Sequence, residues 1–278
     1  MANTGATDVA NTIEKKVSTL LTKTLIQESV GLAVNGVWDR SNEVGPGMDR
    51  LDMIELAELA IQSVDETGAA MTPQTLVPSA AQLLLDQHEA IPFAITEKGL
   101  LQSKIALVSN TIENGVRTMA AAVDDAIFAE AVVAAGTTNT VAGTDALDEI
   151  LACKEQFDGD NVPRMGRAII GSPVWIRRLL GTNNVIRANE FGNNEAIKMG
   201  RLTSVYGFDI FESSSSDVPA DGFIAMGQEA VAFARQKALT FREQFFVLNQ
   251  KTDYALVHLY GVKSTAASNK RIFNFDPV

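Results

Sequence analysis

The stretch EKGLLQSKIALVSNTIENGVRTMAAAVDDAIFAEAVVAAG, residues Glu97–Gly136, is the clearest single element in the sequence. Apolar side chains recur along it every three or four positions, at Leu101, Ile105, Val108, Ile112, Val116, Met119, Val123 and Ile127. That spacing places them on one face of an α-helix, and Gly136 is expected to cap its end. A helix of roughly 35–38 residues would be about 55 Å long, far beyond the usual length in globular proteins. The pattern therefore predicts a spine on which the rest of the chain packs. The alternative is two shorter helices with a break at Asn114–Gly115.

The residues before this helix predict a protruding hairpin. Gly45-Pro46-Gly47 is a strong turn signal, and the stretch VDETGAAMTPQTLVPSA (residues 64–80) is rich in turn formers, as an exposed loop tip would be. The next stretch, AAQLLLDQHEAIPFAIT, is expected to form a long strand interrupted near Pro92. We therefore expect two extended arms around a polar tip between about residues 48 and 96. The helical propensity of Ile54–Ile61 leaves the first arm open.

The N-terminal residues, up to about Val34, are rich in Ser, Thr and Asn and carry a weak amphipathic pattern. Its apolar members are Ile13, Val17, Leu20, Leu21 and Leu25. The pattern is compatible with an arm that becomes ordered on a partner, which is our interpretation, and equally with the first helix of the chain's own core.

The residues after the spine predict a mixture of segregated helices and strands. DALDEILACKEQFDG (residues 145–159) is expected to be a helix with Thr144 or Asp145 as its N-cap and with Leu147, Ile150, Leu151 and Phe157 on one side. RAIIG is a short buried strand, and a helix follows from an N-cap at Ser172, with Pro173 in its first turn, to Gly181. From Gly200 onward we expect strands, with a short helix at QEAVAFAR (residues 228–235). This layout is α+β, without alternating β-α units.

Composition narrows the classes of protein. The chain has 278 residues, of which 46% are hydrophobic and 21% charged, a profile typical of a globular protein with a sizeable core. A formal charge of −11 argues against a sequence-specific nucleic-acid reader, which usually presents a basic face. The single cysteine excludes an intrachain disulfide and suits a reducing compartment. We see no signal peptide and no apolar run long enough for a membrane span, and so expect a soluble, cytoplasmic product without a membrane partner.

The two histidines and the cysteine are the first candidates for chemistry. His88 lies between Asp86 and Glu89, but strand alternation turns Glu89 to the opposite face, and a metal site would need further ligands. His258 alternates with Tyr254, Leu256 and Tyr260, as a half-buried strand residue would. Cys153 lies in a predicted helix and is expected to be a buried packing residue. We predict that none of the three is catalytic or binds a metal.

The other candidates also fail on spacing. Asp158 and Asp160 begin like a calcium loop, but Val162 and Pro163 stand where a ligand and a glycine belong, so we expect a turn. Ser172 is followed by proline and lacks the glycine of a nucleophile elbow. Asp124 and Asp125 are expected on a helix surface, where adjacent residues do not face one another. We therefore predict no enzyme activity, no cofactor and no metal.

The order of elements, together with four stretches, resembles the major capsid protein of tailed double-stranded-DNA bacteriophages. AAQLLLDQHEAIPFAIT resembles the second strand of that family's extended loop, and AAAVDDAIFAEA resembles the end of its spine helix. FDGDNVPRMGRAIIGSPVWIRRLL resembles the passage that opens the axial domain, and RLTSVYGFDIFESSSS resembles a later passage of that domain. The resemblance covers roughly residues 30 to 265.

The resemblance implies a division of the chain into five parts. They are an N-terminal arm (1–45), an extended loop (46–96), a peripheral domain with the spine helix (97–158), an axial domain (159–250) and a C-terminal strand that returns to the peripheral domain (251–278). It also implies self-assembly as hexamers and pentamers into an icosahedral shell around the double-stranded DNA genome, without sequence-specific DNA binding. Scaffolding, portal and decoration proteins are the implied partners, and the implied location is the virion capsid, assembled in the host cytoplasm. The alternative is an encapsulin-type shell around a cargo enzyme. The acidic balance suits a container, because a wall of like charge would not hold phosphates fast.

Overall fold

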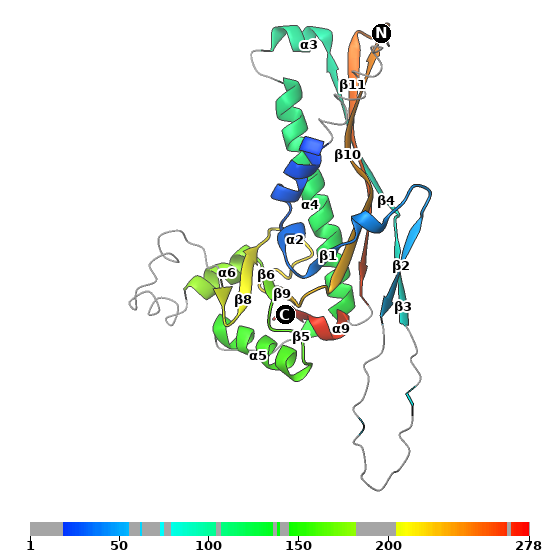
Figure 1. Cartoon of the computed structure of the whole chain (residues 1–278). Helices are drawn as coiled ribbons and strands as arrows, with labels where there is room; N and C mark the ends of the chain where they lie inside the picture. Colours follow the sequence, from blue (N-terminus) through cyan, green and yellow to red (C-terminus); the bar gives the residue numbers. More distant parts are fainter. Residues whose placement is uncertain are drawn as a thin grey trace, which may run out of the picture.

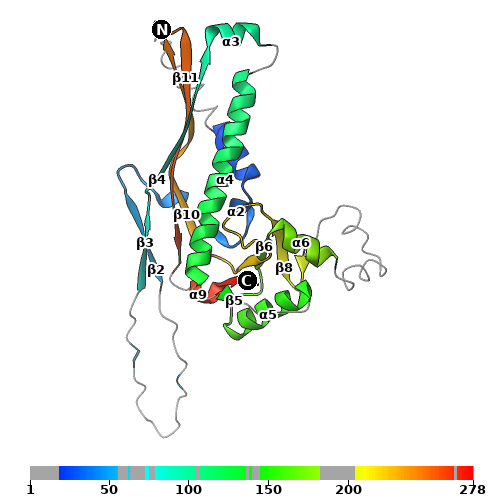
Figure 2. The same cartoon turned by 180° about the vertical axis from the view of Figure 1, so that it is seen from behind.

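The computed structural model describes residues 19–277 except 56–61, 63–72, 75–78, 104–106, 136–137, 140–144, 182–203 and 266–267. The molecule is elongated and is organised around one long helix, α4 (Leu107–Ala135) (Figure 1). A long sheet lies along this helix, a compact sheet covered by shorter helices packs at its C-terminal half, and a two-stranded hairpin projects beside the long sheet (Figure 2). None of the described helices is long and apolar enough to cross a membrane.

The spine helix has the predicted face but not the predicted length. Val116, Met119, Val123 and Ile127 are buried, as the apolar stripe requires. The helix has 29 residues, however, which corresponds to about 43 Å. The first part of the stretch forms a separate helix, α3 (Glu97–Gln102), in which Leu101 is 79% exposed. The expected cap at Gly136 lies outside the described residues.

The alternative break at Asn114–Gly115 is also wrong, because α4 is continuous there. Gly115 has a packing role instead. A Cβ atom at this position would lie 2.5 Å from Leu256 Cδ1 on the long sheet, so only glycine lets the helix approach that strand without displacing the leucine. Leu256, Val116 and Met119 belong to the core cluster that joins helix and sheet.

The long sheet has the order β1-β10-β11-β4. Its strands are β1 (Val37–Asp39), β10 (Val231–Phe246), β11 (Lys251–Ser264) and β4 (Gln87–Thr96). The predicted helix at residues 228–235 is wrong, because Val231–Arg235 begin β10, where they pair with β11 and, in part, with β1. Pairing between distant strands overrides the local helical propensity of that alanine-rich segment.

The interruption expected near Pro92 lies elsewhere. The predicted single strand is split at Leu85–Asp86 into β3 (Ser79–Leu84) and β4, and Pro92 lies inside β4, opposite Ala255. β4 is an edge strand of the long sheet, and a proline without an N–H group is tolerated at an edge. Residues 87–96 therefore belong to the sheet of their own subunit and not to the free hairpin.

The compact sheet has the order β5-β12-β9-β6-β8-β7. Its strands are β5 (Thr138–Asn139), β12 (Ile272–Phe275), β9 (Phe223–Met226), β6 (Ala168–Gly171), β8 (Phe208–Glu212) and β7 (Ser204–Val205). One face packs on α4 through residues such as Ile170 and Ile224, which share a core with Val123 and Ile127. The other face is covered by α5 (Ala146–Gly159) and α6 (Pro173–Leu180). The result is a three-layer unit with the sheet in the middle.

Most local predictions for this unit are confirmed. β6 is fully buried, Ser172 caps α6 by accepting a hydrogen bond from the Trp175 N–H, and α6 ends at Gly181. Asp145 is the N-cap residue of α5. Leu151 is a correction, because it is 41% exposed and does not share the buried side of the helix. The mixture of helices and sheets confirms the α+β class.

The projecting hairpin consists of β2 (Arg50–Glu55) and β3, which pair antiparallel from Arg50–Leu84 to Glu55–Ser79. The first arm is thus a strand as far as Glu55, and most of the polar tip lies outside the described residues. Its base is not free. Leu51, Met53 and Leu83 are buried against Ala232 and Ala234 of β10. A Cβ atom on Gly261 of β11 would lie 2.0 Å from the Leu84 carbonyl oxygen, so this glycine permits the close crossing of β3 over the sheet.

The described N-terminal residues pack on their own chain. Residues 19–28 are helical, and Leu25 is 1% exposed in the core cluster of Val116 and Met119. The short helix α2 (Val30–Ala33) follows, with Ser29 as its cap. The described part therefore behaves as the first helix of the core, the second of our two alternatives, while residues 1–18 lie outside the described residues. The helix η1 (Ser41–Glu43) forms a single turn between β1 and β2. Near the end of the described chain, α9 (Ser268–Arg271) precedes β12.

Candidate functional site

The two histidines and the cysteine differ in how deeply they are buried. His88 is exposed on β4, opposite Leu259, as the strand pattern predicted. Cys153 is fully buried in the core under α5, and burial raises the pKa of its thiol. His258 is a correction, because it is fully buried and not half-buried. Burial, together with the positive charge of Arg235, lowers the pKa of His258 to about 4, so its imidazole is neutral near pH 7.

The acidic candidates are structural. Asp158 accepts a hydrogen bond from Arg167 Nη2 at 2.8 Å, and this bond lowers the pKa of the Asp158 carboxyl. Arg167 also donates to the Val162 carbonyl, so it holds the turn that we predicted here together. Asp124 is a correction to the expected helix surface. It is 6% exposed and accepts hydrogen bonds from the Ser29 hydroxyl and from the Val30 and Gly31 N–H groups, so it fixes α2 on the spine.

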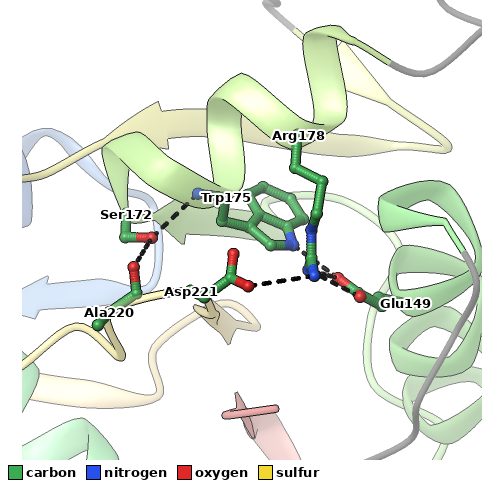
Figure 3. Close-up of polar contacts among 6 residues, drawn as sticks. All are labelled: Glu149, Ser172, Trp175, Arg178, Ala220 and Asp221. Atoms are coloured by element: carbon green, nitrogen blue, oxygen red, sulfur yellow. Dashed lines mark hydrogen bonds and ion pairs between the residues drawn. The ribbon is translucent and has the colours of Figure 1, made fainter. Parts of the chain in front are cut away.

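A buried polar network was not predicted from the sequence. Glu149 of α5 is 2% exposed and accepts hydrogen bonds from Trp175 Nε1 and Arg178 Nη2, both at 2.7 Å (Figure 3). Arg178 also forms an ion pair with Asp221 at 3.3 Å, which ties both helices to the loop before β9. Burial raises the pKa of Glu149 although its two partners act in the opposite direction. Only the Trp and Arg three residues apart in PVWIRRLL hint at this pairing in the sequence.

The described part of the chain gives no support to a metal centre. It contains no group of three or more His, Cys, Asp or Glu side chains that could hold a metal. The buried charged groups described above are paired with one another or with backbone N–H groups, as structural groups are. The candidate functional features are therefore exposed surfaces.

The β10–β11 turn and α3 lie at one end of the molecule (Figure 1), and several of their apolar side chains form an exposed surface. The two elements are joined by the Glu97 N–H, which donates to the Gln250 carbonyl at 3.0 Å. We call this surface the apolar tip, and it consists of Leu100, Leu101, Phe245, Phe246, Val247 and Leu248. Leu248 is 98% exposed and Val247 is 74% exposed. A cluster of large apolar side chains in water is typical of a protein–protein contact.

The projecting hairpin is a second exposed element. It turns Leu51 and Met53 toward its own subunit and leaves Ile54 68% and Leu84 51% exposed. An isolated two-stranded hairpin is at best marginally stable in water, so a projecting one normally lies against something. The tip and the hairpin extend toward opposite ends of the molecule in both views (Figure 1, Figure 2).

Comparison with known proteins identifies the fold. No family model and no curated protein matches the sequence. A structure from Mycobacterium phage Che8 is 19% identical, with a TM-score of 0.72, over 87% of this chain and 90% of that chain. The capsid structure of cyanophage P-SCSP1u is 16% identical, with a TM-score of 0.66, over 86% of this chain and 85% of that chain. The mature capsid of bacteriophage PhiM1 is 12% identical, with a TM-score of 0.64, over 86% of this chain and 84% of that chain.

These matches extend over nearly the whole length of both partners, and they include structures of phage capsids. At identities of 12–19% these matches show a similar backbone fold and say nothing about individual side chains. The spine helix, the long sheet, the compact unit and the hairpin therefore form one architecture that recurs in viral shells. The chain has the fold of these phage capsid structures, in agreement with the fold that the resemblance of its sequence stretches implied.

Proposed function

We propose that the chain is the major capsid protein of a tailed double-stranded-DNA bacteriophage. The observation that carries this proposal is the match of 86–87% of the chain to phage structures, two of which are described as capsids. In this proposal the chain assembles with itself into hexamers and pentamers of an icosahedral shell, and its place is the virion capsid, built in the host cytoplasm.

The apolar tip supports self-assembly energetically. Burying a large apolar side chain contributes about 1.5–3 kcal/mol relative to full exposure. The six tip residues are between 38% and 98% exposed, so covering them would contribute on the order of 5–10 kcal/mol per subunit before the cost of association. Such a gain, repeated over many copies, would favour association between subunits.

The hairpin supports it geometrically. Its base is fixed on β10 and β11, which orients the exposed face of Ile54 and Leu84 relative to the subunit. We propose that the extended loop, residues 46–96, contacts a neighbouring subunit beyond this base. The five-part division of the chain remains a proposal too. In the topology, β10 pairs in the long sheet and β12 in the compact sheet, which favours moving the axial boundary from 250 to about 230.

The enclosed cargo and the other partners follow from the same proposal. A formal charge of −11 favours a shell that surrounds packaged DNA without gripping it, because gripping requires basic residues that neutralise phosphates. Scaffolding, portal and decoration proteins are the proposed partners during and after assembly. The structural matches named above come from phages, which favours a capsid over an encapsulin-type shell.

Electron microscopy of the purified chain tests the proposal. Wild type should form closed particles, and Leu248→Asp should leave a folded subunit that does not, because it places a charge at the most exposed residue of the apolar tip. Met165→Asp is a matched control, since Met165 is 83% exposed but lies outside the tip. Absence of particles for wild type under every assembly condition would contradict the proposed function. Particles from Leu248→Asp would leave the function standing and exclude the tip as the contact.

A further inference from the structure

The β10–β11 turn carries the most exposed residue of the apolar tip, Leu248. Phe246 and Lys251 are the last paired residues of the two strands, and residues 247–250 form the turn between them. The backbone of these four residues therefore determines the direction in which Val247 and Leu248 point.

Gln250, the last residue of this turn, has an unusual backbone conformation. Its φ angle is +43°, in the left-handed region that glycine and asparagine adopt readily and that other residues disfavour. Gln250 is exposed, so burial of its side chain does not account for the conformation. A backbone conformation of this kind persists where the surrounding structure holds it in place.

The start of α3 holds the turn. The Gln250 carbonyl accepts a hydrogen bond from the Glu97 N–H at 3.0 Å, which satisfies one of the N–H groups that a helix leaves unpaired in its first turn. Thr96, the cap of α3, accepts a hydrogen bond from the Gly99 N–H and is also the residue of β4 that pairs with Lys251. The turn, the end of β4 and the start of α3 are thus one connected unit.

The residue after the turn orients the aromatic part of the tip. Lys251 Nζ lies 5.6 Å from the centre of the Phe246 ring and 3.1 Å from Asp253 Oδ1, so the ammonium group is held between the ring and the carboxylate. The apolar tip is therefore a structured surface in the single subunit.

We infer that Gln250 is the positioning residue of the apolar tip. Its left-handed backbone, held by the Glu97 N–H, fixes the direction in which Val247 and Leu248 are presented to a second copy of the chain. This inference rests on the proposed function, because it concerns the same contact between subunits. A surface that is already held loses less conformational freedom on association, so the backbone preference at position 250 sets the strength of the contact.

Two substitutions change this preference and leave every apolar side chain of the tip in place. Asparagine tolerates the left-handed conformation, whereas β-branched valine does not. In light scattering of the full-length chain, Gln250→Asn should form particles at the subunit concentration that wild type needs. Gln250→Val should need a concentration about fivefold higher or more. In unassembled subunits, hydrogen exchange of the Glu97 N–H should be faster in Gln250→Val and unchanged in Gln250→Asn.

Tyr206→Val is the matched control, because Tyr206 has a φ angle of +51° in the β7–β8 turn of the compact sheet. It should change neither the assembly concentration nor the exchange of the Glu97 N–H. The inference is overturned if Gln250→Val assembles at the wild-type concentration, if its Glu97 N–H exchanges as slowly as in wild type, or if Tyr206→Val hinders assembly equally. Each of these outcomes leaves the proposed function standing, whereas absence of wild-type particles would contradict the function and this inference together.

Discussion

His258 shows how a polar residue can be built into a core without a chemical task. Its ring stacks on Tyr260 with centroids 4.9 Å apart, and both ring nitrogens are buried without a hydrogen-bond partner among the described residues. A neutral imidazole tolerates this position, whereas an imidazolium would be a buried, unpaired charge beside Arg235. The residue therefore links the stability of the long sheet to pH.

We predict that acid destabilises the subunit through His258. Its pKa is about 4 in the folded chain against about 6.5 in an unfolded one, so protons bind the unfolded state more tightly. The stability is fully present above pH 6.5 and declines as pH falls toward 4, by about 3 kcal/mol in total. In urea unfolding, His258→Leu should lack this part of the pH dependence, and the exposed His88→Ala should retain it. If the free energy of unfolding of His258→Leu depends on pH as strongly as that of wild type, the prediction is contradicted.

The Glu149 network gives a second prediction at this scale. Glu149→Ala leaves Trp175 Nε1 without its acceptor and Arg178 without its buried partner, and should lower the free energy of unfolding by about 2–3 kcal/mol. Glu149→Gln keeps an acceptor and should cost only about 1 kcal/mol. Chemical denaturation measures both, with the exposed Glu155→Gln on the same helix as the control. Equal costs for Glu149→Ala and Glu155→Gln would show that the network does not stabilise the unit.

Single residues were predictable from the sequence where local spacing decides. Ser172 as a cap and Cys153 as a buried packing residue follow from their neighbours in the chain. The partners of Glu149 and Asp124 were not predictable, because they come from residues 26 or more positions away and single charged letters give no sign of burial. The apolar tip was missed because Val247 and Leu248 continue a strand pattern, and only the fold shows that they are exposed among the described residues.

At the scale of elements, the long helix is the joint between two sheets. Its stripe serves the long sheet through Val116 and Met119 and the compact sheet through Val123 and Ile127, so neither sheet has a complete core without it. Val116→Asp should therefore lower the free energy of unfolding by several kcal/mol, because it buries an unpaired charge, and should yield insoluble protein. Glu113→Ala, one step off the stripe and exposed, should be tolerated, as soluble yield and circular dichroism would show. Equal behaviour of the two variants would mean that the helix faces the sheets differently.

The hairpin can be divided at its base. Replacing residues 56–78 by a short Gly-Ser linker removes the segment that joins β2 to β3 and preserves the Glu55–Ser79 pair and the buried Leu51 and Leu83. This variant should unfold at the same denaturant concentration as wild type and should fail to form particles in electron microscopy. A larger replacement, Leu51–Pro92, should unfold the subunit because it removes part of β4 from the long sheet. Closed particles from the first variant would show that residues 56–78 are not required for assembly.

The types of element were predictable from the sequence where the periodicity is strong. They were not fully predictable where pairing between distant strands determines the structure. The spine, β6, α5 and α6 follow from local pattern. Residues 228–235 are helical by propensity yet form a strand, because β11 pairs with them along most of their length. The split at Leu85–Asp86 arises because β3 pairs with β2 whereas β4 pairs with β11. Both partner strands lie outside this apolar segment, so its own sequence does not reveal the split.

At the scale of the whole molecule, the elongated shape places two exposed contact elements far apart on one rigid spine. A subunit with an apolar tip at one end and a hairpin beside the other half of its long sheet can contact different neighbours at the same time, which is what a closed shell requires. The fold was predictable from the order of elements together with the four resembling stretches. The central claim is that many copies of the chain assemble into a shell.

The mass of the purified full-length chain in solution, measured by sedimentation velocity or native mass spectrometry, tests that claim most directly. A shell predicts megadalton-sized particles, with nucleic acid and not a cargo enzyme inside when they are recovered from infected cells. The Leu248→Asp variant should give subunits or small oligomers in the same experiment. A wild-type chain that remains a monomer or a small oligomer at every concentration, and in every buffer that supports folding, would contradict the capsid function.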